Sequence, residues 1–361
     1  MSPIKLAAIY NLTGGQSGLD VPSWQGARLA AAEANEHGGV LGRPVELVLW
    51  DGGTDPITLG PMTSELLGRN PDVCALFGLS DTDMVLAAAN SCAAVERLFV
   101  TSGATSPHLP QQVPTYLYLA CFGDNVQAAA AAEYAYRGLG ARSAAVVYRR
   151  NDTFTELLQG YFATSFAALG GQLISAGSYA TLDELAHLLT DSALSADLVF
   201  FAAPPDDVID GVGRLRAAGL TAPIMGGDSF DLGDVWEENS TLSGVYFTTH
   251  AFVDAANPDP AMTAFMAAYQ QANPGHEAGA FAALGYDTAR LILVAVAKAG
   301  SDAPAAVLAA LPQVSDFRGL TGTIRYDNGS RIPSKSVTVL QVHAGRVSLA
   351  GQFVPSEIPQ P

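Results

Sequence analysis

The stretch Ile4-Lys5-Leu6-Ala7-Ala8-Ile9-Tyr10 decides the fold class, because it is a short, β-rich apolar run near the start of the chain. A helical pattern follows over about Ser23–His37, and a second strand is predicted at Pro44–Trp50. Short strands that alternate with helices are typical of βαβ units, in which the strands pair in parallel. Because parallel sheets are covered by helices on both faces, we predict an α/β protein.

The same alternation continues in two series. In the first, helices are predicted near Pro56–Arg69 and Thr82–Val95, with strands at Val73–Phe77, Leu98–Thr101 and Tyr116–Leu119. In the second, strands are predicted at Ala144–Tyr148, Gln172–Ser175, Leu198–Ala202, Pro223–Met225 and Val245–Thr248. Helices are predicted between these strands near Thr155–Leu169, Asp183–Leu194 and Asp206–Ala218. Two such series predict two Rossmann-like lobes with parallel sheets.

From Pro258 onward the pattern changes. Helices are predicted at Ala261–Gln271, Ala278–Ala299 and Ala303–Leu311, followed by strands at Leu320–Tyr326 and Ser336–Val342. No stretch rich in Pro, Gly and Ser separates the two series. We therefore expect the chain to pass between the lobes through strand-like segments instead of a flexible tether.

The segment Phe122–Gln127 is predicted to open the second series. Asp124 stands where a helix N-cap is expected, and Gln127 three residues later completes the pattern of a capping box. We therefore expect the Asp124 side chain to accept hydrogen bonds from the first turn of the helix.

Composition limits the possible partners. The chain has 361 residues, 35 acidic and 18 basic side chains, and a formal net charge of −17. Its length suits two globular domains. Because like charges repel, we expect no nucleic-acid partner and no anionic lipid surface. No apolar run is expected to reach the ~20 residues of a bilayer span, so we expect no membrane insertion.

The start of the chain, Met1–Lys5, shows no basic and apolar export signal. We expect either a cytoplasmic protein or one whose signal is missing from this sequence. Cys74, Cys92 and Cys121 have no CxxC spacing, and the six histidines are dispersed. Buried thiols and solvated or core histidines are therefore predicted, and no metal or cofactor is expected.

Enzymatic signatures are missing from the sequence. Asn11–Gly18 is rich in glycine but lacks the GxGxxG spacing of dinucleotide sites, and no GxxxxGK[ST], GxSxG or HExxH motif occurs. Asp51–Asp55 fits no EF-hand loop and is predicted to form a turn and a helix cap. We therefore predict a protein that is not an enzyme.

Two loops at predicted strand ends in the first series, Gly78–Thr82 and Thr101–Pro107, offer hydroxyls and backbone N–H groups. Open α/β sheets bind ligands at such carboxyl ends, and a helix start favours an anion. The two loops thus suit a carboxylate. Ordinary N-capping by Ser80 or Asp81 is the alternative for the first loop.

A third loop, Gly226–Asp228, ends a strand of the second series. The Asp228 carboxylate either caps the helix predicted near Asp231–Glu237 or attracts an ammonium group. An anion site in one lobe and a cation site in the other would hold a zwitterion.

Several segments together resemble the type I periplasmic binding proteins of ABC importers, in particular the leucine/isoleucine/valine-binding branch. They are Thr13-Gly14, Gly26-Ala27, Asn35–Gly42, Thr101–Pro107, Leu215–Leu220, Met225–Asp228 and Gly285–Ala289. Their order and spacing carry the resemblance, which covers essentially the whole chain. It implies a two-lobed Venus flytrap fold with a hinge.

The resemblance implies an N-terminal lobe of residues 1–121 and 252–331 and a C-terminal lobe of residues 122–251 and 332–361. It also implies a periplasmic or cell-surface-tethered protein. Such a protein captures a small hydrophobic or branched-chain α-amino acid by hinge closure and delivers it to an ABC permease in the membrane.

The family holds the ligand carboxylate with hydroxyls and backbone amides of the first lobe. These positions match Ser80 or Thr82, Gly103 and Thr105. The acidic residue that binds the α-ammonium matches Asp228, where close relatives often have Glu. The resemblance therefore implies that these residues hold the two charged ends of the ligand.

Aromatic positions of the family's side-chain pocket match Phe154 and Phe281, and Tyr286 is a further candidate. Two positions depart from the family pattern. Pro204 stands where leucine-binding relatives have a tyrosine, and Leu19 where they have an aromatic residue. Both changes are expected to reshape the pocket for the ligand side chain.

Two alternatives remain open from the sequence. A cytoplasmic ligand sensor of the amide-sensing type would explain why no export signal is seen. A binder of an aromatic carboxylate is expected instead if Asp228 points away from the ligand.

Overall fold

The computed structural model describes residues 2–189, 191–315, 317–327 and 329–361. The chain forms two compact units, which we describe separately. Unit 1 consists of Met1–Phe122 and Val253–Lys335, and unit 2 of Gly123–Phe252 and Ser336–Pro361. The chain therefore passes between the units at three places.

Unit 1 is built on a five-stranded sheet in the order β2-β1-β3-β4-β5. Its strands are β1 (Ile4–Tyr10), β2 (Val45–Asp51), β3 (Val73–Gly78), β4 (Leu98–Thr101) and β5 (Leu117–Leu119). All neighbouring strands pair in parallel, so their carboxyl ends lie at one edge of the sheet. This arrangement confirms the predicted fold class for unit 1.

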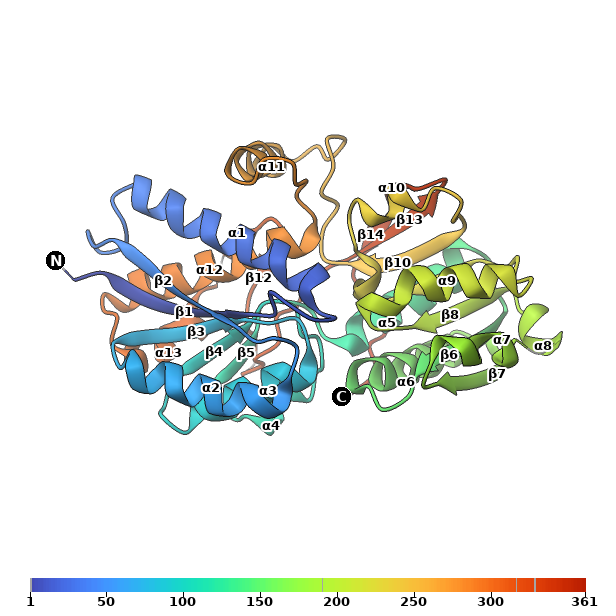
Figure 1. Cartoon of the computed structure of the whole chain (residues 1–361), viewed down its shortest axis with the longest axis horizontal. Coiled ribbons are helices and arrows are strands. Elements are labelled where there is room, and N and C mark those ends of the chain that lie inside the picture. The colour runs from blue at the N-terminus through green and yellow to red at the C-terminus, as the bar shows by residue number, and fades with distance from the viewer. Residues whose placement is uncertain (1, 190, 316, 328) are drawn as a thin grey trace. The chain divides into compact units, whose positions relative to one another are not determined.

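Helices cover both faces of this sheet (Figure 1). α1 (Ser17–Glu36) and α12 (Ala280–Ala299) pack together on one face, and α2 (Pro56–Arg69) and α3 (Thr82–Ala93) on the other. Gly26 of α1 allows a very close approach to α12, because a Cβ added there would lie 1.9 Å from the Ala282 carbonyl oxygen.

α12 is long and apolar enough to cross a membrane by length and composition alone, with 20 residues and a mean hydropathy of 1.5. The expectation that no apolar run approaches this length is therefore wrong. In the structure 83% of its apolar window is buried inside the protein. A core helix of a globular unit can have the same length and apolar composition as a membrane-spanning helix. The packing of α12 against α1 explains the apolar sequence of α12.

Unit 2 contains a seven-stranded sheet in the order β14-β13-β10-β9-β8-β6-β7. Its strands are β6 (Ser143–Arg149), β7 (Gln172–Tyr179), β8 (Leu198–Ala202), β9 (Ile224–Gly226), β10 (Val245–Thr249), β13 (Val337–His343) and β14 (Arg346–Phe353). β6 to β10 pair in parallel, while β13 is antiparallel to both β10 and β14. The sequence analysis did not predict β14.

Two apolar clusters cover the faces of this sheet. α5 (Asp124–Glu133) and α6 (Thr153–Ala168) build one cluster, in which Phe162 stacks on Phe200 with 3.9 Å between ring centroids. α9 (Val208–Ala217) belongs to the other cluster and lies on the opposite side of the sheet in Figure 1. Unit 2 also contains the helices α7 (Leu185–Leu188), α8 (Asp191–Leu194) and α10 (Val235–Glu238).

Unit 1 also contains the helices α4 (Leu109–Gln112), α11 (Pro260–Ala272) and α13 (Pro304–Ala310).

Several predicted elements differ from the structure. α1 begins at Ser17, well before the predicted Ser23, with Pro22 inside the helix. Leu19 and Asp20 are buried in the added turns, so tertiary contacts outweigh the helix-starting preference of proline. The single helix predicted over Asp183–Leu194 is divided into a 3₁₀ turn, α7 and α8, and residue 190 lies outside the described residues.

The strand predicted at Leu320–Tyr326 is instead a hairpin of β11 (Phe317–Gly319) and β12 (Gly322–Ile324). The buried carboxylate of Asp287 explains the turn. It accepts hydrogen bonds from the backbone N–H of Leu320 at 2.9 Å and of Thr321 at 2.8 Å. A side chain from α12 thus fixes a bend that local sequence periodicity does not show.

Candidate functional site

The carboxyl end of β3 leads into the first predicted ligand loop of unit 1. Leu79 has a φ of 58°, which is uncommon for a residue with a side chain, and its N–H donates to the Ile9 carbonyl at 3.0 Å. The preceding Gly78 has a φ of 126°, and a Cβ there would lie 1.9 Å from the same oxygen. This strained turn sets the direction in which Ser80 leaves the strand.

Three predicted site residues gather at this edge of unit 1. A Cβ added to Gly103 would lie 2.8 Å from Ser80 Oγ and 2.9 Å from Phe281 Cε1. The Gly103 N–H itself donates to the Leu79 carbonyl at 3.2 Å. The implied role of that amide in holding a ligand is therefore not supported by its geometry, whereas the Ser80 hydroxyl and the Phe281 ring both lie next to Gly103.

Thr82 and Thr105 are both buried in unit 1. Thr82 is the first residue of α3, and Asp81 is the N-cap, accepting a hydrogen bond from the Met84 N–H at 2.9 Å. The alternative of ordinary capping at this helix start is thus correct for Asp81. Its negative charge reduces the attraction of the helix terminus for a second anion.

Leu19 and Tyr286 complete the predicted set in unit 1. Leu19 is buried in the first turn of α1. The Tyr286 hydroxyl donates to Glu33 at 2.5 Å, and burial, together with this hydrogen bond, raises the Tyr286 pKa. Because that hydroxyl is already engaged near the C-terminal end of α1, we do not carry Tyr286 into the proposed site.

Asp228 of unit 2 is 3% exposed and is the second residue after the end of β9. Its Oδ1 accepts a hydrogen bond from Gln127 Nε2 at 3.0 Å, and its Oδ2 lies 2.9 Å from His250 Nε2. Gln127 Oε1 in turn accepts from the Asp228 N–H at 3.2 Å and from Thr248 Oγ1 at 2.9 Å. The carboxylate is therefore held in one orientation by partners on α5 and after β10.

The capping box predicted for Asp124 and Gln127 is wrong. Gly123 is the N-cap of α5, no side-chain cap forms, and Asp124 is the first helical residue. The Gln127 amide instead donates to Asp124 Oδ1 at 2.9 Å as well as to Asp228. Tertiary hydrogen bonding to a buried carboxylate has replaced the local cap.

The sequence analysis assigned no role to His250. It is 1% exposed, as the prediction of a core histidine implies, but its partner is the predicted ammonium-binding residue Asp228. The sequence signal that could have identified His250 is its position immediately after β10, next to the carboxyl end of β9. Asp231 lies nearby, and its pKa is raised to about 6. Burial is the main cause and the Asp228 charge a smaller one, while a hydrogen bond from Thr249 lowers the pKa.

Phe154 and Pro204 lie at the same edge of unit 2 as Asp228. Both are partly buried. A Cβ added to Gly227 would lie 3.4 Å from Phe154 Cζ, which places this ring beside the residue before Asp228. Ser229 Oγ donates to the Ala203 carbonyl at 2.7 Å and so links the loop after β9 to the residue before Pro204. The structure thus brings Phe154, Pro204 and Asp228 together.

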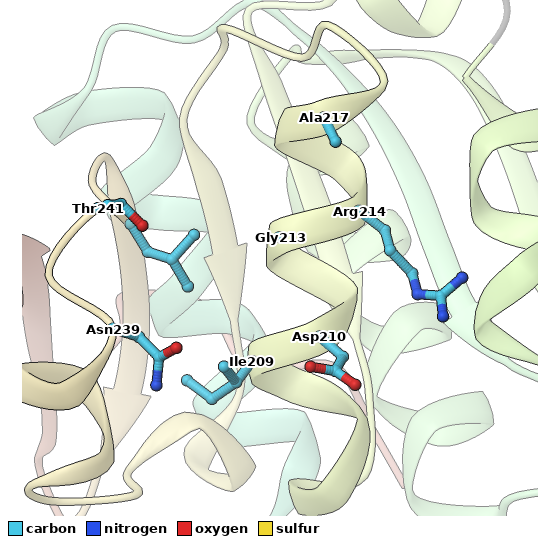
Figure 2. Close-up of a pocket in the computed structure, with 8 residues that line it drawn as sticks. Ile209, Asp210, Gly213, Arg214, Ala217, Asn239 and Thr241 are labelled. Atoms are coloured by element: carbon cyan, nitrogen blue, oxygen red, sulfur yellow. The ribbon is translucent and has the colours of Figure 1, made fainter.

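A groove of about 450 Å³ lies elsewhere in unit 2, along α9. Figure 2 shows Ile209, Gly213 and Ala217 on the helix, opposite Asn239 and Thr241. None of the predicted site residues lines it. The Arg214 guanidinium beside this groove is paired with Asp183 at 2.5 Å, so we assign the groove no ligand.

The candidate metal ligands and thiols of the chain form no metal site in its described part. There, no group of three or more His, Cys, Asp or Glu side chains is arranged to hold a metal ion. The side chains of Cys74, Cys92 and Cys121 are buried thiols, which confirms the prediction. Burial raises the pKa of Cys74 to about 12, so its thiol is a poor nucleophile.

Residues 3–346 match the model of a family described as "Periplasmic binding protein". The chain is 24% identical over 351 residues to the Leu/Ile/Val-binding protein BraC3 of Rhizobium johnstonii, covering 96% of this chain and 94% of that protein. It is similar to the leucine-binding protein LivK of Thermotoga maritima, with 28% identity, a TM-score of 0.87, and coverage of 98% and 99%.

A third similar structure is a solute-binding protein of an ABC transporter from Rhodopseudomonas palustris BisB5, in complex with 3,4-dihydroxybenzoic acid. Its identity to this chain is 21%, with a TM-score of 0.85 and coverage of 99% of both chains. This likeness supports the fold alone.

Proposed function

The chain belongs to the periplasmic binding protein family, and from this premise we propose that it captures a small hydrophobic or branched-chain α-amino acid outside the cytoplasm. We further propose that units 1 and 2 act as the lobes of a hinged receptor, whose closed form delivers the ligand to an ABC permease. The Leu/Ile/Val-binding and leucine-binding relatives support this ligand class. The role is binding and not catalysis.

The buried carboxylate of Asp228, held by Gln127 and His250, carries this proposal. A zwitterion that leaves water needs a fixed partner for each charge. Asp228 is a preorganised anion for the ammonium end, and the Ser80 hydroxyl beside Gly103 is a donor for the carboxylate end. Charge-assisted hydrogen bonds contribute about 1.5–3 kcal/mol each, so a few of them account for micromolar affinity, about −8 kcal/mol.

A carboxylate without an amine is the second candidate ligand. Both Asp228 oxygens already have partners within unit 2. If His250 is protonated, the pair is neutral and attracts an ammonium less strongly. An aromatic acid would then fit better, and the similar Rhodopseudomonas palustris protein is in complex with one, 3,4-dihydroxybenzoic acid. Phe154 and Phe281 are the aromatic side chains that would contact its ring.

A thermal-shift screen of the natural amino acids, with keto acids, amides and aromatic acids as controls, tests the proposed ligand class. Selective binding raises the melting temperature by mass action. We expect leucine, isoleucine or valine to give the largest shift. A shift with aromatic acids alone would favour the second candidate.

The variant Asp228→Asn tests the proposed residue, because it keeps the shape of the side chain and removes the charge. We expect its calorimetric Kd for leucine to be at least about tenfold weaker, which corresponds to ~1.4 kcal/mol. Asp210→Asn, at an exposed position on α9, is the matched control and should bind as the unmodified protein does. Equal leucine affinity in the Asp228→Asn variant and the control would refute the assignment.

A further inference from the structure

Asp20 is a carboxyl group with no solvent exposure, located in the first turns of α1 in unit 1. Its Oδ2 accepts a hydrogen bond from the Asn11 N–H at 2.8 Å. Among the described residues, its Oδ1 has no partner with normal hydrogen-bond geometry. A buried, charged oxygen without a donor is costly, whereas a proton on Oδ1 removes the charge and supplies a donor.

Polar side chains surround this carboxyl. The Ser80 hydroxyl and the Asn11 backbone lower its pKa through hydrogen bonding, but burial has the larger effect and raises the pKa to about 7. Ser80 Oγ and Ser23 Oγ are likewise buried and, within the described residues, have no partner of normal geometry. The Ser80 hydroxyl and the Asn11 side chain are donors that favour an ionised Asp20, but the effect of burial outweighs them. The two serine oxygens are also acceptors for a protonated carboxyl group.

The charged groups on the neighbouring elements are mostly acidic. The charge of Asp81, the N-cap of α3, contributes to the raised Asp20 pKa. Asp51 at the end of β2 accepts from the Leu12 N–H at 2.9 Å. These charges disfavour ionisation of Asp20, since like charges repel.

Three more charged groups lie on α3 and α12. Asp83 is exposed in the first turn of α3, Asp287 of α12 is bound to the β11–β12 turn, and Arg290 of α12 lies 5.3 Å from the Tyr286 ring centroid. The Tyr10 hydroxyl, which lies 3.0 Å from Ser102 Oγ, is a further titratable group that interacts with Asp20. Burial raises its pKa, so it stays neutral near pH 7.

Ser80 connects this cluster to the proposed ligand site. It neighbours Asp20 on one side, and its Oγ would lie 2.8 Å from a Cβ at Gly103. A protonated Asp20 donates to Ser80 Oγ, which leaves the Ser80 O–H group to donate toward a ligand. An ionised Asp20 instead accepts the Ser80 O–H and adds a negative charge behind the site.

We propose that Asp20 is a positioning residue, which holds a proton while a ligand carboxylate is bound beside Ser80. This inference rests on the proposed function, since it concerns the carboxylate end of that ligand. When Asp20 is ionised in the free protein, binding takes up one proton from solvent, and that proton ends on Oδ1. When Asp20 is already neutral, binding takes up none.

Calorimetric titration with L-leucine and, separately, with 4-hydroxybenzoate tests this, because both probes carry a carboxylate. From about pH 5.5 to pH 7 the Kd of the unmodified protein should stay constant, and above about pH 7 it should weaken by up to about tenfold per pH unit. In that upper range the binding enthalpy should depend on the ionisation enthalpy of the buffer, which reports proton uptake directly.

The variant Asp20→Asn should bind with the same Kd across this pH range and without proton uptake. Asp83→Asn removes the same charge from an exposed position in the same region and should keep the slope of the unmodified protein. A Kd of the unmodified protein that does not change above about pH 7, or the same slope in Asp20→Asn, would overturn the inference.

If neither probe binds at any pH, the proposed function fails. Whether Asp20 holds a proton near pH 7 must then be measured without a ligand. A ¹³C NMR titration of the free protein, with the Asp20 signal assigned by comparison with Asp20→Asn, measures the carboxyl directly. A pKa near 7 supports the buried proton. A pKa near the ordinary value of about 4 overturns it.

Discussion

At the scale of single residues, the pairing of Asp228 with His250 is the feature on which the proposed site most depends. Both side chains are buried, and their atoms Oδ2 and Nε2 lie 2.9 Å apart. Removal of one partner leaves a buried polar group without its hydrogen bond, which costs more than the net contribution of the bond itself.

We therefore predict that His250→Ala lowers the free energy of unfolding by about 2–4 kcal/mol, as measured by denaturant titration. A double-mutant cycle with Asp228→Asn should give a coupling energy of about 1–3 kcal/mol. His276→Ala, at an exposed position, should stay within about 0.5 kcal/mol of the unmodified protein. Coupling near zero would show that the two side chains are not energetically paired.

The raised pKa of Asp231 predicts how the stability of the protein depends on pH. Burial raises its pKa to about 6 in the folded protein, against about 3.9 when unfolded. Between these values the folded state binds more protons than the unfolded state, so this residue's contribution to stability falls as pH rises and is constant above about 6. The side chain is partly exposed, so we expect a loss of only about 1–2 kcal/mol.

Asp231→Asn removes this titration. From about pH 4 to pH 7 the unfolding free energy of the variant should therefore gain about 1–2 kcal/mol relative to the unmodified protein. Asp234→Asn, at an exposed position in the same loop, is the control. A difference that does not change with pH, or that changes in the opposite direction, would contradict the raised pKa.

At the scale of helices and strands, glycines decide how closely α1 and α12 pack. Gly26→Ala would place a Cβ 1.9 Å from the Ala282 carbonyl oxygen. The helices must then separate, and we predict a loss of about 2–3 kcal/mol in unfolding free energy. Gly160 in α6 has open space around its Cβ position, so Gly160→Ala should gain up to about 1 kcal/mol. If Gly26→Ala and Gly160→Ala changed the free energy of unfolding in the same direction, this would argue against the close packing of α1 and α12.

Local sequence patterns were sufficient to predict many of the helices and strands. The strands Ile4–Tyr10, Leu98–Thr101 and Leu198–Ala202 and the helix Pro56–Arg69 have the predicted bounds. Continuous apolar runs identify buried parallel strands because both faces of such a strand are covered. The structure departs from prediction where distant residues act, as in the β11–β12 turn held by Asp287 and in the buried start of α1.

The site itself was only partly predictable. Asp228, Ser80 and Gly103 could be chosen because each follows the carboxyl end of a parallel strand in its own sheet. His250 and Gln127 could not be assigned as partners of Asp228, because they are 22 and 101 residues away from it in the chain. Asp20 was missed for a similar reason, since its burial depends on contacts from β1 and the loop after β3.

At the scale of the whole molecule, the sheets of the two units offer two strand-end loop clusters of opposite chemical character. Unit 1 presents hydroxyls near Ser80, and unit 2 presents the carboxylate of Asp228. The chain connects the units at three places, which suits the proposed hinge. The central claim is that one ligand is recognised at both its carboxylate and its ammonium ends.

Calorimetric comparison of L-leucine with 4-methylpentanoate, which is leucine without its amino group, tests this claim most directly. Both molecules offer the same carboxylate and the same side chain. We predict that leucine binds at least about 100-fold more tightly, a difference of ~2.7 kcal/mol that a charge-assisted hydrogen bond to Asp228 accounts for. Affinities within about threefold of each other, or tighter binding of 4-methylpentanoate, would contradict recognition of the ammonium group.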